Sequence, residues 1–191
     1  MRPFYHNDGK IMQQQPAIFL DRDNTLNVDI GYTHKIADFR WVDGAPAALS
    51  LFTKAGLDVF IVTNQGGIGR GLFTVEMMHA FNDHLCAEAA MHGGKIKDIA
   101  YCPHHPDAIT PEFRTPCDCR KPGHRMLTDL ADKWSLDLSK SVMIGDRDSD
   151  VLAGQAAGCH AYLFDGGDLQ SLARDVLATH FAARRQGVVN G

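Results

Sequence analysis

The segment Ala17-Ile18-Phe19-Leu20-Asp21-Arg22-Asp23-Asn24-Thr25 places two carboxylates directly after a short apolar run. Such a run is typical of a buried strand in a parallel sheet. Alternate residues of an extended chain project to the same side, so Asp21 and Asp23 should face one site. In open α/β sheets, ligands bind just outside the carboxyl ends of the strands. The pair alone is weak evidence, because acids at a strand end more often form turns or helix caps.

Three further polar signals, each after an apolar segment or beside a turn, strengthen the functional interpretation. They are Thr63-Asn64, Arg120-Lys121 and Gly145-Asp146-Arg147-Asp148. Together with the first segment they predict one polar site at one edge of a sheet.

Length and composition fit one soluble domain. The chain has 191 residues, with 45% hydrophobic and 22% charged residues and a net charge of −4. That charge gives no reason to expect nucleic acid or membrane as a partner. Residues 1–15 are polar and Gln-rich, so they resemble neither a signal peptide nor a spanning helix. We expect a cytoplasmic protein; the sequence does not show the oligomeric state, and a monomer is the default expectation.

Apolar and amphipathic stretches alternate along the chain, which predicts an α/β fold. We expect a Rossmann-like three-layer α/β/α sandwich with a mainly parallel sheet and no large cap domain. Strands are expected at 17–20, 58–62, 96–101, 141–144 and 160–164. Helices are expected at 44–55, 74–92, 126–134, 148–157 and 169–185, where Pro46, Thr74 and Gly158 supply start and stop signals.

The polar signals supply the parts that attack on a phosphate monoester requires. Such an attack needs a fixed nucleophile and positive or hydrogen-bonding groups around the phosphoryl oxygens. Asp21 would form an aspartyl-phosphate, and Asp23 would protonate the leaving group and then activate water. Thr63 and Asn64 would bind phosphoryl oxygens, unless they simply begin a Gly-rich turn. Lys121 would stabilise the transferring group, although a lone lysine is usually a solvated surface residue.

A magnesium site is expected near the same acids. Asp146 follows an apolar run and suits Mg²⁺, which prefers one or two carboxylates plus water and phosphate. We expect Mg²⁺ at Asp21, Asp23 and Asp146. Asp148 and Asp150 are interpreted as residues that cap and start the following helix.

A second cluster has the composition of a structural zinc site: Cys102, His104, Cys117 and Cys119. Cys₃His ligation leaves no open position, so the metal would stabilise a loop and take no part in catalysis. The alternative is a group of ordinary buried thiols. His105 is a competing ligand, and Cys86 and Cys159 are interpreted as core residues. Because this loop leads into Arg120-Lys121, it would hold both side chains in place.

The four polar signals resemble the motifs of the haloacid dehalogenase-like phosphohydrolases, in order Asp21-x-Asp23-x-Thr25, Thr63-Asn64, Lys121 and Gly145-Asp146-x-x-x-Asp150. The resemblance runs from Pro16 to Leu163. It implies an N-terminal extension at 1–15, a phosphatase domain at 16–185 and a tail at 186–191. Asn24 stands where the family usually has Gly, and we expect it to accept a left-handed backbone.

The zinc-loop pattern Cys-Pro-His-His-Pro then Cys-Asp-Cys-Arg-Lys-Pro looks like the subgroup of heptose-1,7-bisphosphate 7-phosphatases and histidinol-phosphate phosphatases. The long spacer between His104 and Cys117 favours a heptose bisphosphate over histidinol phosphate, and thus a role in lipopolysaccharide biosynthesis. The similarity implies that the following residues bind the phosphorylated sugar: Asp29, Gly31, Tyr32, Gln65, Gly66, Arg120 and Arg147. A binding module that has lost catalysis is the alternative from another class, but Asp21, Asp23 and Asp146 are all present.

Overall fold

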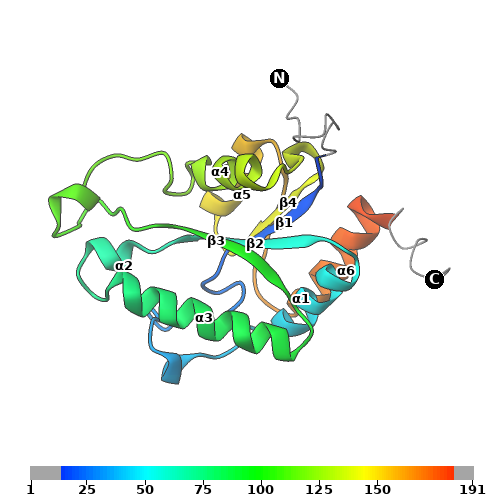
Figure 1. The fold of residues 1–191 in the computed structure, drawn as a ribbon, viewed down its shortest axis with the longest axis horizontal. Helices are drawn as coiled ribbons and strands as arrows, with labels where there is room; N and C mark the ends of the chain where they lie inside the picture. The colour runs from blue at the N-terminus through cyan, green and yellow to red at the C-terminus, as the bar shows by residue number, and fades with distance from the viewer. Residues whose placement is uncertain (1–13, 183–191) are drawn as a thin grey trace, which may run out of the picture.

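The computed structural model describes residues 14–182 as an open parallel sheet with helices on both faces (Figure 1). The strands are β1 (Ala17–Leu20), β2 (Asp58–Asn64), β3 (Ile96–Cys102), β4 (Val142–Gly145) and β5 (His160–Leu163). The α-helices are α1 (Ala45–Lys54), α2 (Gly66–Gly69), α3 (Val75–Met91), α4 (Arg125–Trp134), α5 (Asp148–Ala157) and α6 (Leu169–His180). Short 3-10 helices occupy Ile36–Asp38, Pro111–Phe113 and Leu138–Lys140.

In the strand order β3-β2-β1-β4-β5, the direction in which successive strands are added to the sheet reverses beside β1. The chain moves outward from β1 through β2 to β3, then crosses to β4 and β5 on the other side. All neighbouring strands are parallel, and Leu20 lies level with both Ile61 and Ile144. The carboxyl ends of β1, β2 and β4 therefore meet at the crevice where open α/β sheets bind ligands.

Alternate residues of β1 fill two different hydrophobic cores, and this makes the three layers. Ile18 and Leu20 pack with residues of α1, α3 and α6. Ala17 and Phe19 pack with residues of α4 and α5 on the opposite face. Figure 1 shows these two groups of helices on either side of the sheet. All four side chains are completely buried, which agrees with the continuous apolar pattern of the strand.

Most expected elements are present, with differences at their ends. β2 continues to Asn64, and the short helix α2 was not expected. α6 ends at His180, because Phe181 leaves helical geometry (φ −130°) and buries its ring in the core. The expected helix to Arg185 was therefore too long. Arg185 itself lies outside the described residues. The described part of the proposed extension is fixed by Gln15, which pairs with Leu136. None of the described helices is long and apolar enough to cross a membrane.

Candidate active site

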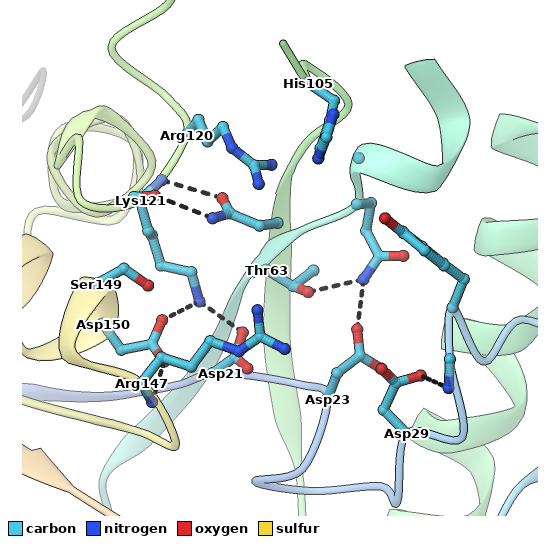
Figure 2. A pocket seen from close by; sticks show the side chains of 15 residues that line it. Asp21, Asp23, Asp29, Thr63, His105, Arg120, Lys121, Arg147, Ser149 and Asp150 are labelled. Carbon is cyan, nitrogen blue, oxygen red and sulfur yellow. Dashed lines mark hydrogen bonds and ion pairs between the residues drawn. The ribbon is translucent and has the colours of Figure 1, made fainter. Parts of the chain in front are cut away.

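A pocket of about 440 Å³ opens at the carboxyl ends of the central strands (Figure 2). Its lining contains every catalytic or substrate-binding residue named from the sequence: Asp21, Asp23, Asp29, Gly31, Tyr32, Thr63, Asn64, Gln65, Gly66, Arg120, Lys121 and Arg147. It also contains three residues that the sequence did not assign to it: His105, Ser149 and Asp150.

Lys121 lies between two buried carboxylates. Its Nζ is 2.5 Å from Asp21 Oδ1 and 2.6 Å from Asp150 Oδ1, and it donates to the Val62 carbonyl at 2.7 Å. Burial lowers the pKa of Lys121, but the two carboxylates outweigh burial and raise it above its usual value, so the ammonium stays charged. Burial raises the pKa of Asp21 to about 7 although Lys121 opposes the shift, and Asp150 and Asp23 raise it further.

Asp21, Asp146 and Asp150 form a group that fits a divalent cation. Each offers a carboxylate oxygen, and these oxygens lie within 4.8 Å of one another. Asp146 Oδ1 is buried without a hydrogen-bond partner in the described part of the chain. Burial, followed by the charge of Asp150, raises the pKa of Asp146. An orphaned carboxylate oxygen beside two further acids matches the oxygen ligands that Mg²⁺ prefers.

The interpretation of Asp150 as a helix-starting acid was incomplete. Its Oδ2 does accept the backbone N–H of Arg147 at 3.0 Å, which caps α5. Its other oxygen, however, binds Lys121, and the residue is 1% exposed. A Cβ at Gly145 would lie 2.4 Å from Asp150 Oδ2, so only glycine lets Asp150 approach this closely. Asp148 is the first residue of α5, as expected.

Asp23 is held by three side chains. Arg22 Nη2 lies 2.9 Å from Asp23 Oδ1 and 3.0 Å from Oδ2. Gln65 Nε2 donates to Asp23 Oδ2 at 2.8 Å, and Asn27 Nδ2 donates to Oδ1 at 3.2 Å. Gln65 Nε2 also lies 2.8 Å from Thr63 Oγ1, so Gln65 links the ends of β1 and β2 (Figure 2). Participation of Asp23 in the magnesium site stays a prediction.

Asn64 fixes the backbone of Lys121. Its Oδ1 accepts the Lys121 N–H at 3.0 Å, and its Nδ2 donates to the Lys121 carbonyl at 3.1 Å. This reciprocal pair joins the end of β2 to the loop before α4. An amide nitrogen has two hydrogens, so one N–H of Asn64 remains for a ligand.

The segment after the first motif folds over the pocket as a loop held by Asp29. Asp29 Oδ1 accepts the backbone N–H groups of Gly31 at 3.2 Å and Thr33 at 2.8 Å. Tyr32 accepts a hydrogen bond from Arg70, which also lies over its ring. Asn24 has φ 59°, so the expected left-handed backbone is confirmed, and its side chain accepts the Asp29 N–H at 2.9 Å.

His105 and Arg120 lie side by side over Gly66. A Cβ at Gly66 would be 2.9 Å from His105 Cδ2 and 3.3 Å from Arg120 Nη1. Burial, and then the charge of Arg120, lowers the pKa of His105. Arg147 and Ser149 enter from the start of α5 (Figure 2). In the sequence, the neighbouring cysteines made His105 a possible metal ligand. In the structure the loop turns so that His105 lines the pocket, a position that the sequence does not indicate.

The four expected zinc ligands are brought together. Cys102 Sγ lies 3.6 Å from Cys117 Sγ and 3.5 Å from His104 Nδ1. Cys119 Sγ lies between 3.0 and 3.4 Å from the other three ligand atoms. Tetrahedral zinc with ordinary bond lengths separates its ligand atoms by roughly 3.5–3.8 Å. The cluster therefore has nearly the dimensions of a closed Cys₃His site. His105 is outside it.

Comparisons with known proteins agree with this geometry. The HAD-hydrolase-like family model matches residues 118–187. The chain is 38% identical over 164 residues to D-glycero-beta-D-manno-heptose-1,7-bisphosphate 7-phosphatase of Rhodopseudomonas palustris, covering 86% of this chain and 91% of that protein. It is 43% identical over 142 residues to the protein of the same name from Escherichia coli K12, covering 74% of each.

Solved structures give the same picture. A putative HAD-like phosphatase from Mesorhizobium loti superimposes with a TM-score of 0.80 at 32% identity, covering 86% of this chain and 85% of that one. D,D-heptose 1,7-bisphosphate phosphatase from B. bronchiseptica, complexed with magnesium and phosphate, has a TM-score of 0.77 at 29% identity, covering 86% of this chain and 99% of that one.

Proposed function

Since this chain belongs to the haloacid dehalogenase-like phosphatases and is a phosphoric monoester hydrolase, we propose that it removes the 7-phosphate of D-glycero-β-D-manno-heptose 1,7-bisphosphate. The observation that carries this proposal is the division of one pocket into two parts. Asp21, Lys121 and Asp150 form a buried reaction centre, and Arg120 and Arg147 line the same pocket as further cations. A sugar with two phosphates offers an anion to each part.

The reaction proceeds through a phosphorylated aspartate. An oxygen of Asp21 attacks phosphorus, and the bond between phosphorus and the sugar oxygen breaks. Asp23 gives its proton to the leaving alkoxide. It then takes a proton from the water that attacks the aspartyl-phosphate, which releases inorganic phosphate and restores Asp21. Lys121 and Thr63 stabilise charge on the phosphoryl oxygens. Asn64 fixes Lys121 and offers its remaining N–H.

Asp21, Asp146 and Asp150 fit Mg²⁺, the ion used by phosphatases of this family, and Asp23 is proposed to complete the site. When bound, Mg²⁺ neutralises charge on the phosphoryl oxygens. Asp150 also keeps Lys121 in place, so it serves both the metal and the ammonium group.

Cys102, His104, Cys117 and Cys119 are proposed to bind a structural zinc ion. The zinc would act through the chain that directly follows Cys119, because that chain carries Arg120 and Lys121. Arg120 donates to the His104 carbonyl at 3.0 Å, so one ligand residue is also a direct contact of the substrate-binding arginine.

The remaining lining residues are proposed to bind the rest of the substrate. Asp29, Gly31 and Tyr32 would meet the sugar hydroxyls, and Gln65 and Gly66 would extend the phosphate site. Arg120 and Arg147 would pair with the phosphate that stays on the sugar. A guanidinium has five N–H donors, so the contact of Arg120 with His104 leaves others for the substrate.

The test is a comparison of kcat/KM for heptose 1,7-bisphosphate, histidinol phosphate and simple sugar monophosphates at one Mg²⁺ concentration. We expect the bisphosphate to be turned over with the highest kcat/KM, because remote contacts orient the reacting group. A clear preference for histidinol phosphate would refute the substrate while leaving the phosphatase chemistry intact.

A further inference from the structure

Arg22 is a buried charge for which the proposed mechanism has no use. Its side chain is 1% exposed, and it is the largest fully buried side chain in the described part of the chain. Burying a guanidinium is costly unless the charge is paired and its N–H groups are hydrogen-bonded. A residue of this kind, next to the proposed acid and base, calls for a specific explanation.

Arg22 makes a three-contact clamp on the carboxylate of Asp23. Nη2 lies 2.9 Å from Oδ1 and 3.0 Å from Oδ2, and Nε lies 3.1 Å from Oδ1. Nη2 also donates to Gln65 Oε1 at 3.1 Å, while the amide nitrogen of Gln65 donates to Asp23. Arg22 and Gln65 thus hold Asp23 from two directions and also hold each other.

The other side of the guanidinium is fixed by the body of the protein. Nη1 donates to Asn82 Oδ1 on α3 at 3.1 Å, and Nη2 donates to the Thr33 carbonyl at 3.1 Å. The guanidinium carbon lies 4.8 Å from the centre of the Phe81 ring. A planar fork with contacts on each edge has little freedom to rotate. Through Arg22, the position of Asp23 is therefore fixed relative to α3.

We propose that Arg22 is a positioning residue for Asp23, holding its carboxyl group where it exchanges protons with the leaving group and with water. This inference rests on the proposed role of Asp23 as acid and base. Arg22 touches neither substrate nor metal in this scheme. Its hydrogen bonds within the proposed site go to Asp23 and to Gln65, which itself holds Asp23. Its loss should therefore impair proton transfer by Asp23 much more than attack by Asp21.

Proton transfer to the leaving group can be isolated with substituted phenyl phosphates, which have similar size but leaving groups of different basicity. We would measure kcat/KM, which reports steps up to the first irreversible one, at saturating Mg²⁺. For Arg22→Lys, which keeps the charge but loses the fork, we expect a loss of about tenfold or more with phenyl phosphate. With 4-nitrophenyl phosphate, whose leaving group needs no proton, the change should stay within about threefold.

Three control variants keep the result interpretable. Asp23→Asn should give the same steep dependence on leaving-group basicity, and the Arg22→Lys/Asp23→Asn double variant should be no steeper, because both residues act on one step. Phe52→Leu changes a core residue of α1 that is absent from the pocket lining. It should lower Tm without changing the slope, which is the dependence of log kcat/KM on leaving-group pKa. Should Arg22→Lys not fold, Asn82→Ala replaces it, since that change keeps Arg22 and removes the hydrogen bond between its Nη1 and α3.

The inference is overturned if Arg22→Lys, or Asn82→Ala in its place, shows the same dependence of kcat/KM on leaving-group basicity as the wild type while Asp23→Asn shows a steeper one. It is also overturned if Phe52→Leu steepens the slope, because lost stability would then explain the effect. If Asp23→Asn itself keeps the wild-type dependence on leaving-group basicity, the result refutes the proposed role of Asp23.

Discussion

Lys121 Nζ lies 2.5 Å from Asp21 Oδ1, although 100 residues separate the two in the chain. The contact depends on Asn64, which binds the Lys121 backbone from the end of β2. Because β1 and β2 are neighbours, the two strand ends bring the carboxylate and the ammonium group together. The proposed nucleophile is thus aligned by tertiary structure before any substrate arrives.

Asp21→Asn should reduce phosphatase activity by several orders of magnitude, since it keeps the shape of the side chain and removes the nucleophile. The measurement is kcat/KM with a sugar phosphate at saturating Mg²⁺. Asp58→Asn is the matched control, because Asp58 lies at the opposite end of β2 and is partly exposed. Near-normal turnover by Asp21→Asn would exclude the aspartyl-phosphate.

The same substitution should change how stability depends on pH in Mg²⁺-free protein. Burial raises the folded-state pKa of Asp21 from 3.8 to about 7. A group with a raised folded-state pKa contributes stability that is complete below the unfolded pKa and is lost as pH rises through the folded pKa. The wild type should therefore lose stability between about pH 4 and pH 7 relative to Asp21→Asn, by on the order of a few kcal/mol.

Urea denaturation of both proteins in chelator, at a series of pH values, gives this difference directly. Titrations common to both proteins cancel in the subtraction. We expect the advantage of Asp21→Asn to grow with pH and then level off above about pH 7–8. A difference that does not vary with pH would show that Asp21 ionises as freely as in the unfolded chain.

Purified protein should contain one tightly bound zinc per chain. Structural zinc sites in small peptides have apparent binding energies of about 10–16 kcal/mol. Removing the metal should release the loop that carries Arg120 and so raise KM for the bisphosphate. The effect on kcat should be smaller, because Asn64 holds Lys121 independently. Elemental analysis and steady-state kinetics before and after chelation provide the measurement.

Single substitutions test which histidine is the ligand. His104→Ala should lose zinc, whereas His105→Ala should keep it and affect only substrate binding, since His105 lines the pocket and lies outside the cysteine cluster. Cys86→Ser is the control thiol, on α3. Zinc retained by His104→Ala and lost by His105→Ala would reverse the assignment.

Local patterns predicted most of the elements and the pocket. The first and last polar motifs follow β1 and β4, Thr63-Asn64 ends β2, and parallel strands end at one edge of the sheet. Thr74 does cap α3, and Gly158 does end α5 in a left-handed conformation. The partners of buried groups were not predictable in this way. The contact of Asp150 with Lys121, the hydrogen bond of Arg22 to Asn82 and the turn of His105 into the pocket all join distant segments. No local spacing encodes such contacts.

Arg120→Ala should reduce kcat/KM more for heptose 1,7-bisphosphate than for the corresponding monophosphate. The reason is that only the bisphosphate offers a second anion, and a charge-assisted hydrogen bond to Arg contributes about 1.5–3 kcal/mol, or roughly a tenfold to hundredfold effect. Arg125→Ala is the matched control, because Arg125 is more than half exposed, pairs with Asp129 on α4 and is absent from the pocket lining. An equal loss with both substrates would place the second phosphate elsewhere, and Arg147→Ala would then be the variant expected to discriminate between them.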